Sequence, residues 1–218
     1  MAVYKIAGLN LKMEPRTKFA RELLEEYRTT ENRVDAVIAP WPGDPEYAGF
    51  LRQVSMELLR HHEGMYIHGG ALYYKGQVYL FTAPSGTGKS THLALWKKLL
   101  GDKVTVLNGD KPFLRCIDGK ILVYGGPWRG KEGWGINGSG PLAGIYVLRR
   151  GEENRIAPMS DLDALNTLLA ATIYPEQEQD LQKLLDIMEK LLRQVPVYEF
   201  FCNTQISAAE TVLQHIDR

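Results

Sequence analysis

The chain has 218 residues, of which 44% are hydrophobic and 24% charged, a balance typical of a globular protein with one compact core. Lysine plus arginine and aspartate plus glutamate both number 26, so the formal net charge is zero, which argues against a surface for nucleic acid or anionic membranes. The two isolated cysteines, the absence of a membrane-spanning apolar run and the absence of a signal-peptide pattern lead us to expect a reduced, cytoplasmic protein.

Hydrophobic periodicity predicts helices and strands along the whole chain. In the first half we expect, in order, a strand or hairpin over residues 3–13, a helix over 17–27, a strand over 35–40, a helix over 46–62, paired strands over 65–74 and 77–82, and a helix over 89–100. In the second half we expect a strand over 104–107, a hairpin over 113–117 and 120–124, a strand over 143–148, helices over 160–173 and 175–194, a strand over 197–201 and a terminal helix capped at Ser207. This order predicts an α/β fold with helices flanking one mixed sheet.

Residues 83–90, APSGTGKS, match a phosphate-binding loop in which Ala83 replaces the usual first glycine. With a strand before it and a helix after it, the loop would direct backbone N–H groups and a helix N-terminus at the phosphates of ATP. Lys89 is expected to reach the β- and γ-phosphates, and Ser90 to bind Mg²⁺. The residues expected to bind the nucleotide are Ser85, Gly86, Thr87, Gly88, Lys89, Ser90 and Thr91. The alternative is an ordinary helix N-terminus with a capping serine.

Asp110 follows the predicted strand over residues 104–107. The end of a strand beside the phosphate loop is where a P-loop protein carries a carboxylate that binds the metal or accepts a proton. We therefore expect Asp110 to be a metal ligand or a general base. The alternative is a Gly109–Asp110 turn without a chemical role.

Residues 125–140 contain seven glycines in sixteen positions. Such a segment is predicted to be either a functional lid or a poorly ordered loop. Arg129 and Lys131 within it are candidates to stabilise the charge that develops on a transferred phosphoryl group. An ordinary solvated loop is the alternative, but Trp128 and Trp134 argue against it because tryptophan side chains favour a surface to pack on.

His68, the phosphate loop and Asp110 follow one another in an order that resembles a known family. The stretch IHGGALYYKGQVYLFTAPSGTGKST, followed by Asp110, is similar to the C-terminal domain of HPr kinase/phosphorylase and to the related nucleotide core of phosphoenolpyruvate carboxykinase. The resemblance is clear over residues 68–110, looser after them, and absent over 1–60. It implies a mixed-sheet P-loop kinase core over 61–218. Residues 1–60, which lie outside the resemblance, are expected to form a small N-terminal α/β segment packed on that core. It also implies that His68 lies beside the γ-phosphate, as a metal ligand or hydrogen-bonded to the reacting carboxylate.

One position departs from the family pattern, which has two adjacent aspartates after the strand. Gly109 stands where the first of them would be. Either Asp110 serves both as metal ligand and as base, or Ser90 and the phosphates hold the metal, or another carboxylate such as Glu132 completes the site.

The resemblance implies an ATP- and Mg²⁺-dependent kinase that transfers the γ-phosphoryl group to a hydroxyl. The expected acceptor is a serine or threonine of a small protein or peptide, and a small-molecule hydroxyl is the other acceptor considered. The alternatives are a nucleotide-binding adaptor that transfers no phosphoryl group and a carboxykinase-like enzyme acting on a small carboxylic acid. The resemblance further implies a homo-oligomer, and neither nucleic acid nor membrane is an expected partner.

Overall fold

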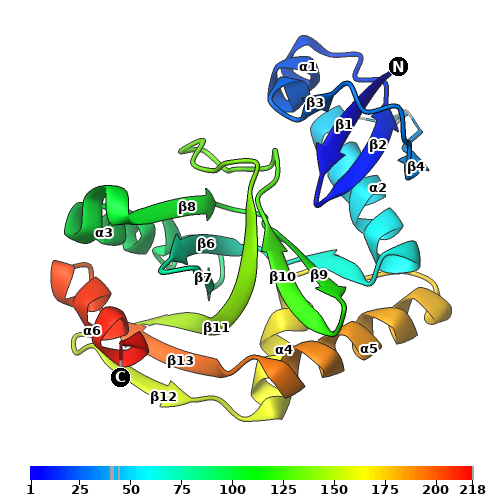
Figure 1. Ribbon diagram of the computed structural model, residues 1–218. Coiled ribbons are helices and arrows are strands. Elements are labelled where there is room, and N and C mark those ends of the chain that lie inside the picture. The colour runs from blue at the N-terminus through cyan, green and yellow to red at the C-terminus, as the bar shows by residue number, and fades with distance from the viewer. Residues whose placement is uncertain (40–41, 44, 218) are drawn as a thin grey trace.

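The computed structural model describes residues 1–39, 42–43 and 45–217. Two β-sheets and six helices in this part of the chain give a mixed α/β architecture (Figure 1). The elements in chain order are β1 (Ala2–Ile6), β2 (Leu9–Met13), α1 (Lys18–Glu25), β3 (Arg28–Thr29), β4 (Ala36–Val37), α2 (Glu46–His61), β5 (Gly64–Tyr66), β6 (Gly69–Tyr74), β7 (Gln77–Thr82), α3 (Lys89–Leu100), the 3₁₀ turn η1 (Gly101–Lys103), β8 (Val104–Asn108), β9 (Phe113–Ile117), β10 (Lys120–Tyr124), β11 (Ser139–Arg150), β12 (Arg155–Pro158), α4 (Asp161–Ala170), α5 (Glu178–Gln194), β13 (Val197–Cys202) and α6 (Ile206–Ile216).

The N-terminal part forms a small sheet in the order β3–β1–β2–β4, accompanied by α1 and α2. Alternate side chains of the β1–β2 hairpin and one face of each helix share a buried cluster, as the period of two in strands predicts. Phe113 of β9 and Trp128 complete this cluster from the rest of the chain. These two aromatic side chains therefore attach the N-terminal part to the large sheet.

The large sheet runs in the order β5–β9–β10–β11–β7–β6–β8, with β13 beside β11 and β12 beside β13. The long strand β11 joins its two halves, because residues 139–141 pair with β10, whereas residue 142 and residues 144–150 pair with β7 or β13. β11 is parallel to β7 and β13, and the other pairs of this sheet are antiparallel. The C-terminal ends of β7 and β11 consequently lie at the same edge, which is where the phosphate loop begins.

Helices cover both faces of the large sheet (Figure 1). Neighbouring side chains of β7 illustrate the two layers, since Leu80 belongs to the cluster under α4 and α5, whereas Phe81 belongs to the cluster under α3 and α6. This alternation follows from the side-chain period of a strand whose two faces are both buried.

Several predicted elements are confirmed with the expected bounds. The strand over 77–82, the helix over 89–100 and the hairpin over 113–117 and 120–124 match β7, α3, β9 and β10. Ser160 caps α4 as predicted, because its side chain accepts a hydrogen bond from the backbone N–H of Asp163.

Other boundaries were predicted wrongly. β11 begins at Ser139 rather than at residue 143, and α5 begins at Glu178 rather than at residue 175. α6 begins at Ile206, so Ser207 is not its cap; its hydroxyl instead accepts a hydrogen bond from Asn154 at 3.0 Å. The predicted strand over 35–40 is reduced to β4, and its last residue, Pro40, lies outside the described residues.

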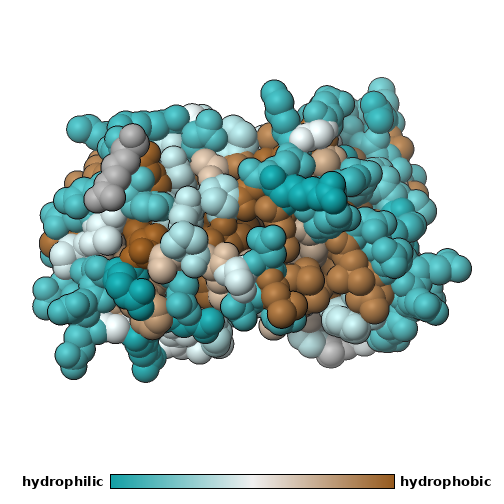
Figure 2. All heavy atoms as spheres, turned by 90° about the horizontal axis from the view of Figure 1, so that it is seen from below, coloured by the Kyte–Doolittle hydropathy of each residue, from teal (hydrophilic) through white to brown (hydrophobic). Residues whose placement is uncertain are grey.

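The face that carries α4, α5 and β13 shows apolar side chains gathered near its middle, with polar ones around them (Figure 2). A groove between α4 and α5 includes Leu162, which is 68% exposed, together with Leu165 and Leu192. None of the groove residues lines the cavities described below. No helix in the described part of the chain has the length and apolarity needed to cross a membrane.

Candidate functional site

The loop between β7 and α3 turns sharply at two glycines. Gly86 has a φ of 77° and Gly88 a φ of 124°, a region of backbone conformation that favours glycine. A Cβ at either position would meet no atom within 4 Å, so the backbone conformation rather than a lack of space calls for glycine. Ala83 is buried in the cluster that contains Phe81 and Leu93. The methyl group at the position of the usual first glycine therefore packs into the core.

Lys89 lies in the first turn of α3 and is only 8% exposed. Its ammonium donates hydrogen bonds to the carbonyl oxygens of Ala83 at 2.8 Å and Pro84 at 3.4 Å. Burial lowers the pKa of Lys89 from its ordinary value, and the negative charge of Asp110 partly opposes this effect. Lys89 is thus a buried cation whose hydrogen-bond partners are carbonyl groups of its own loop.

The side-chain amide of the buried Asn108 holds the turn that carries Asp110. The side-chain oxygen of Asn108 accepts hydrogen bonds from the backbone N–H groups of Asp110 and Lys111, both at 2.8 Å. The side-chain N–H of the same residue donates to the carbonyl of Gly126 at 2.9 Å. Asn108 is fully buried, so these bonds satisfy groups that have no access to water. The role of Asn108 was not predicted from the sequence, although asparagine before a Gly-Asp pair is a known turn signal.

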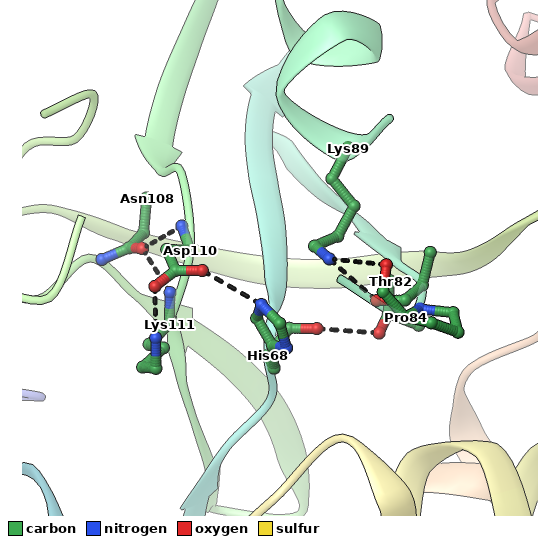
Figure 3. A network of polar contacts seen from close by, with 8 residues as sticks. His68, Thr82, Pro84, Lys89, Asn108, Asp110 and Lys111 are labelled. Atoms are coloured by element: carbon green, nitrogen blue, oxygen red, sulfur yellow. Dashed lines mark hydrogen bonds and ion pairs between the residues drawn. The ribbon is translucent and has the colours of Figure 1, made fainter. Parts of the chain in front are cut away.

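The carboxylate of Asp110 lies between two nitrogen donors (Figure 3). One oxygen is 3.1 Å from Nε2 of His68, and the other contacts the ammonium of Lys111. Burial alone would raise the pKa of Asp110, but the hydrogen bonds from His68 and Lys111 outweigh it and hold the pKa at about 2. Asp110 is therefore firmly ionised at neutral pH.

His68 occupies the junction between β5 and β6. Its backbone N–H donates to the carbonyl of Ala171 at 2.6 Å, and its carbonyl accepts a hydrogen bond from the Thr82 hydroxyl at 2.8 Å. Thr82 is the last residue of β7, so the histidine is tied to the strand that leads into the phosphate loop. The structure thus brings His68 and Asp110 together beside this loop.

A cavity of about 600 Å³, here called the phosphate-loop cavity, unites most of the predicted site residues. Thr87 and Arg129 are not among its lining residues. Its walls are His68, Ser85, Gly86, Gly88, Lys89, Ser90, Thr91, Gly109, Asp110, Lys111, Gly130, Lys131 and Glu132. The cavity places the side chains of Lys89, Lys111 and Lys131 around a space that Ser90, Asp110 and Glu132 also border. Such a mixture of cations and oxygen donors suits a phosphate–metal complex.

Arg129 points away from this cavity. Its guanidinium donates to the carboxylate of Glu26 at 2.7 Å and to the hydroxyl of Tyr27 at 3.0 Å, and it lies 5.6 Å from the centre of the Tyr27 ring. These partners belong to the N-terminal segment, which is about 100 residues away in the sequence. Lys131, and the unpredicted Lys111, are the cations that the structure places on the cavity wall in this region.

The glycine-rich segment over residues 125–140 is anchored at its two tryptophans. Trp128 is fully buried, packs edge-on against Phe113 and donates its indole N–H to the carbonyl of Tyr47 at 3.0 Å. Trp134 lies under the ammonium of Lys97, which is 4.8 Å from its ring centre. The expectation that both tryptophans pack on a surface is confirmed, and the segment bridges α2 and α3 (Figure 1).

The structure leaves no room at position 109 for a second carboxylate beside Asp110. A Cβ at this position would lie 2.9 Å from the carbonyl oxygen of Arg129 and 3.2 Å from that of Trp134. The Gly109 N–H also donates to the Trp134 carbonyl at 2.9 Å. The backbone of the glycine-rich segment therefore occupies the place of a side chain. In the described residues no group of three or more histidine, cysteine or acidic side chains could hold a metal ion by itself.

Arg150 is a further residue of the loop's surroundings that was not predicted from the sequence. It ends β11, and its guanidinium donates a hydrogen bond to the carbonyl of Gly86 at 2.5 Å. Because β11 and β7 are parallel neighbours, the residue that ends β11 lies near the loop that follows β7. The Arg149–Arg150 pair after a predicted strand was the available signal.

Comparison with known proteins gives a distant likeness in fold. No family model matches the chain, and no curated protein matches it. Among solved structures, the chain is similar to the HPr(Ser) kinase/phosphatase from Coxiella burnetii at 12% sequence identity and a TM-score of 0.38. The match covers 70% of this chain and 95% of that one. At this level the likeness concerns the fold and assigns no activity to the chain.

Proposed function

We propose that the chain is an ATP-dependent kinase that transfers the γ-phosphoryl group to a hydroxyl. The observation that carries this proposal is the meeting of Lys89, the phosphate loop and the His68–Asp110 pair on the walls of one cavity. A volume of about 600 Å³ is in the range of pockets that enclose small ligands.

The phosphates of ATP would lie against residues 85–91, where backbone N–H groups and the N-terminus of α3 favour anions. Lys89 would exchange the carbonyls of Ala83 and Pro84 for phosphate oxygens. This exchange is favourable because a charge-assisted bond to an anion is stronger than a bond to a neutral carbonyl. Arg150 would hold the loop in place through its hydrogen bond to the Gly86 carbonyl.

Mg²⁺ would be held by the hydroxyl of Ser90 and the carboxylate of Asp110, with Glu132 as a further oxygen donor on the same wall. These are the oxygen ligands that this ion prefers, and the phosphates and water would complete its coordination. When bound, the metal would neutralise part of the charge on the phosphates.

In the transfer step the acceptor oxygen forms a bond to the γ-phosphorus while the bond between that phosphorus and the β–γ bridging oxygen breaks, which releases ADP. Asp110 would accept a hydrogen bond from the acceptor hydroxyl and so orient it for attack. A carboxylate with a pKa of about 2 is a weak base. Asp110 would therefore orient the proton of the acceptor hydroxyl, and this proton would pass to phosphate or solvent as the new bond forms. Lys111 and Lys131 would stabilise the charge on the transferred group.

A nucleotide-binding adaptor without phosphoryl transfer is a second candidate. The observation that favours it is Gly109, since the backbone beside it leaves no room for a second carboxylate. In that case the cavity would bind ATP, and the nucleotide would alter the contacts of the glycine-rich segment.

Single-turnover mixing with γ-labelled ATP and Mg²⁺ separates the two candidates. The acceptors are a set of serine- and threonine-containing peptides and a set of free alcohols, with labelled GTP in parallel. A kinase moves the label to a hydroxyl of at least one acceptor. Nucleotide binding with neither transfer of the label to an acceptor nor release of labelled inorganic phosphate across both sets would favour the adaptor instead.

A further inference from the structure

A second cavity, of about 550 Å³, adjoins the first and opens beside α1. We call it the α1 cavity. Asp110, Gly130 and Lys131 line both cavities, so the proposed reacting carboxylate lies at the boundary between them. Gly130 has a φ of 77°, and a Cβ at this position would lie 3.0 Å from the Cβ of Asp110. A glycine here therefore leaves Asp110 accessible from the α1 side.

Helix α1 has one broad apolar face, of which the core covers only a part. Ala20 and Leu24 are buried against the small sheet. Phe19 and Leu23 lie at the edge of this face, next to Glu22 and the C-cap residue Glu26, and all four line the α1 cavity. Phe19 is 59% exposed, so its ring is available to pack against a bound ligand.

The wall opposite α1 continues this apolar surface. Tyr47 lies 5.8 Å from Phe19, measured between ring centres, and Pro127 borders the same space. Burial raises the pKa of the Tyr47 hydroxyl, and the nearby Asp110 carboxylate raises it further, so this side chain stays neutral. An apolar wall consequently leads from the open side of the cavity towards Asp110.

The charges around the α1 cavity balance one another. Glu26 is paired with Arg129 at 2.7 Å, and Glu22 with Lys18 at 3.7 Å. Lys131 and Asp110 add one charge of each sign at the inner end. The cavity therefore has no excess positive charge that would select an anionic metabolite.

A buried carboxylate fixes the position of α1. Glu46, at the start of α2, accepts hydrogen bonds from the backbone N–H groups of Arg16 and Thr17 and from the Thr17 hydroxyl, at 2.6–2.9 Å. Thr17 in turn caps α1 by accepting from the Ala20 N–H. The apolar face of α1 is thereby held in place before any ligand binds.

We infer that the α1 cavity binds the acceptor, and that this acceptor is a peptide whose hydroxyl residue stands next to an uncharged apolar or aromatic residue. The hydroxyl would reach Asp110, while the neighbouring side chain would pack against Phe19, Leu23 and Tyr47. The inference rests on the proposed kinase activity and deepens it, because it assigns the acceptor preference to residues outside the family resemblance.

The test compares pentapeptides with blocked termini. Each contains one serine, one test residue directly before or after the serine, and glycine at the other three positions. The test residue is phenylalanine, alanine or aspartate. Transfer from labelled ATP is expected to favour phenylalanine over aspartate by about tenfold or more in kcat/KM, since burying an aromatic ring contributes at least this much. Equal use of the three neighbours would overturn the inference.

A Phe19→Ala variant tests whether the preference for a phenylalanine neighbour arises in the α1 cavity. Phe19 is largely exposed, so its removal leaves the core intact. The KM for the phenylalanine peptide is expected to rise about tenfold, with the loss falling on KM rather than on kcat. Tyr174→Ala is the matched control, because Tyr174 is 61% exposed and lies outside both cavities, and it is expected to behave like the wild type.

Peptide binding is measured separately by fluorescence polarisation with a labelled phenylalanine peptide and a non-hydrolysable ATP analogue. Binding that Phe19→Ala weakens supports the α1 cavity even if no transfer occurs, in which case the kinase proposal alone fails. Binding that is insensitive to Phe19→Ala overturns the inference and leaves the kinase proposal standing. Phosphorylation of 2-phenylethanol but of no peptide would also overturn it, in favour of a small-molecule acceptor.

Discussion

The two cavities that meet at Asp110 are built in different ways. The walls of the phosphate-loop cavity come from His68 and from three short stretches of chain, within residues 85–91, 109–111 and 130–132, and they carry polar and charged groups. The α1 cavity combines side chains from α1, α2 and the glycine-rich segment, and much of its wall is apolar. The first arrangement is set by local backbone geometry, and the second by long-range packing.

This difference suggests that the two cavities recognise different ligands. A continuous loop with fixed backbone N–H groups is suited to a ligand that never varies, such as a triphosphate. A wall assembled from distant side chains can change one residue at a time, which suits the recognition of a particular acceptor. Substitutions in the two regions should therefore affect different measurements.

The largest effect is expected from Asp110→Asn, which changes the boundary between the cavities. Phosphoryl transfer should fall by about 10³-fold, because the proposed acceptor hydroxyl would lose its charged hydrogen-bond partner and the proposed metal would lose a ligand. Nucleotide affinity should change much less. Asp118→Asn, in the β9–β10 turn, is the control, and single-turnover transfer is the measurement. Normal transfer by Asp110→Asn would show that this carboxylate has no part in the reaction.

Lys89→Ala should affect the phosphate-loop cavity alone. Loss of a buried ammonium that would bond phosphate should weaken ATP binding by about 2–3 kcal/mol, or roughly 30- to 150-fold in Kd by isothermal titration. Lys98→Ala, at an exposed position of the same helix, should bind ATP as the wild type does. Unchanged ATP affinity in Lys89→Ala would mean that the nucleotide does not use this loop.

Gly109→Ala should disturb the wall between β8 and the glycine-rich segment. The added methyl group would meet the Arg129 carbonyl at 2.9 Å, which should lower the free energy of unfolding by about 1–3 kcal/mol. Gly144→Ala is the control, because its nearest contact would be an ordinary 3.6 Å. Denaturant titration measures both variants. Equal stabilities would show that the segment moves aside easily and that a second carboxylate could have been accommodated.

The pH dependence of stability sharpens the role of Asp110. Its pKa is about 2 in the folded chain and near 3.8 in the unfolded one, so the ionised carboxylate stabilises the folded state by about 2 kcal/mol above pH 4. This contribution is lost as the pH falls through about 2. NMR titration of the carboxyl carbon should give this low pKa, and His68→Ala should raise it. A pKa near the ordinary value in the wild type would mean that the His68 and Lys111 contacts do not persist in solution.

The sequence predicted elements well where the signal was local. β7, α3 and the β9–β10 hairpin are bounded by glycines or by the loop motif, and their predicted bounds agree with the structure. β11 was predicted too short because Gly140 and Pro141 hide its first residues, which pair with β10. The edge strand β12 was missed because it is four residues long, and arginine and proline stand at its ends.

In the candidate site, too, local sequence signals were informative and long-range contacts were not. His68, Lys89 and Asp110 could be placed from motif order, and they lie together in the structure. Arg129 was predicted to stabilise charge on the transferred phosphoryl group because it is a cation in the glycine-rich segment, yet it bonds Glu26 and Tyr27 instead. No local pattern connects residues so far apart, so sequence periodicity could not reveal that contact or the α1 cavity.

The buried amide of Asn108 has a consequence for the chemical ageing of the protein. An Asn-Gly pair in a flexible chain deamidates readily, because the amide nitrogen of the glycine attacks the side-chain carbonyl of the asparagine. Here that nitrogen is held by the Trp134 carbonyl, and the Asn108 amide makes three hydrogen bonds of its own. Both reacting groups are therefore fixed for as long as residues 125–140 stay docked. Slow deamidation at Asn108 during storage would record how often that segment comes away from β8.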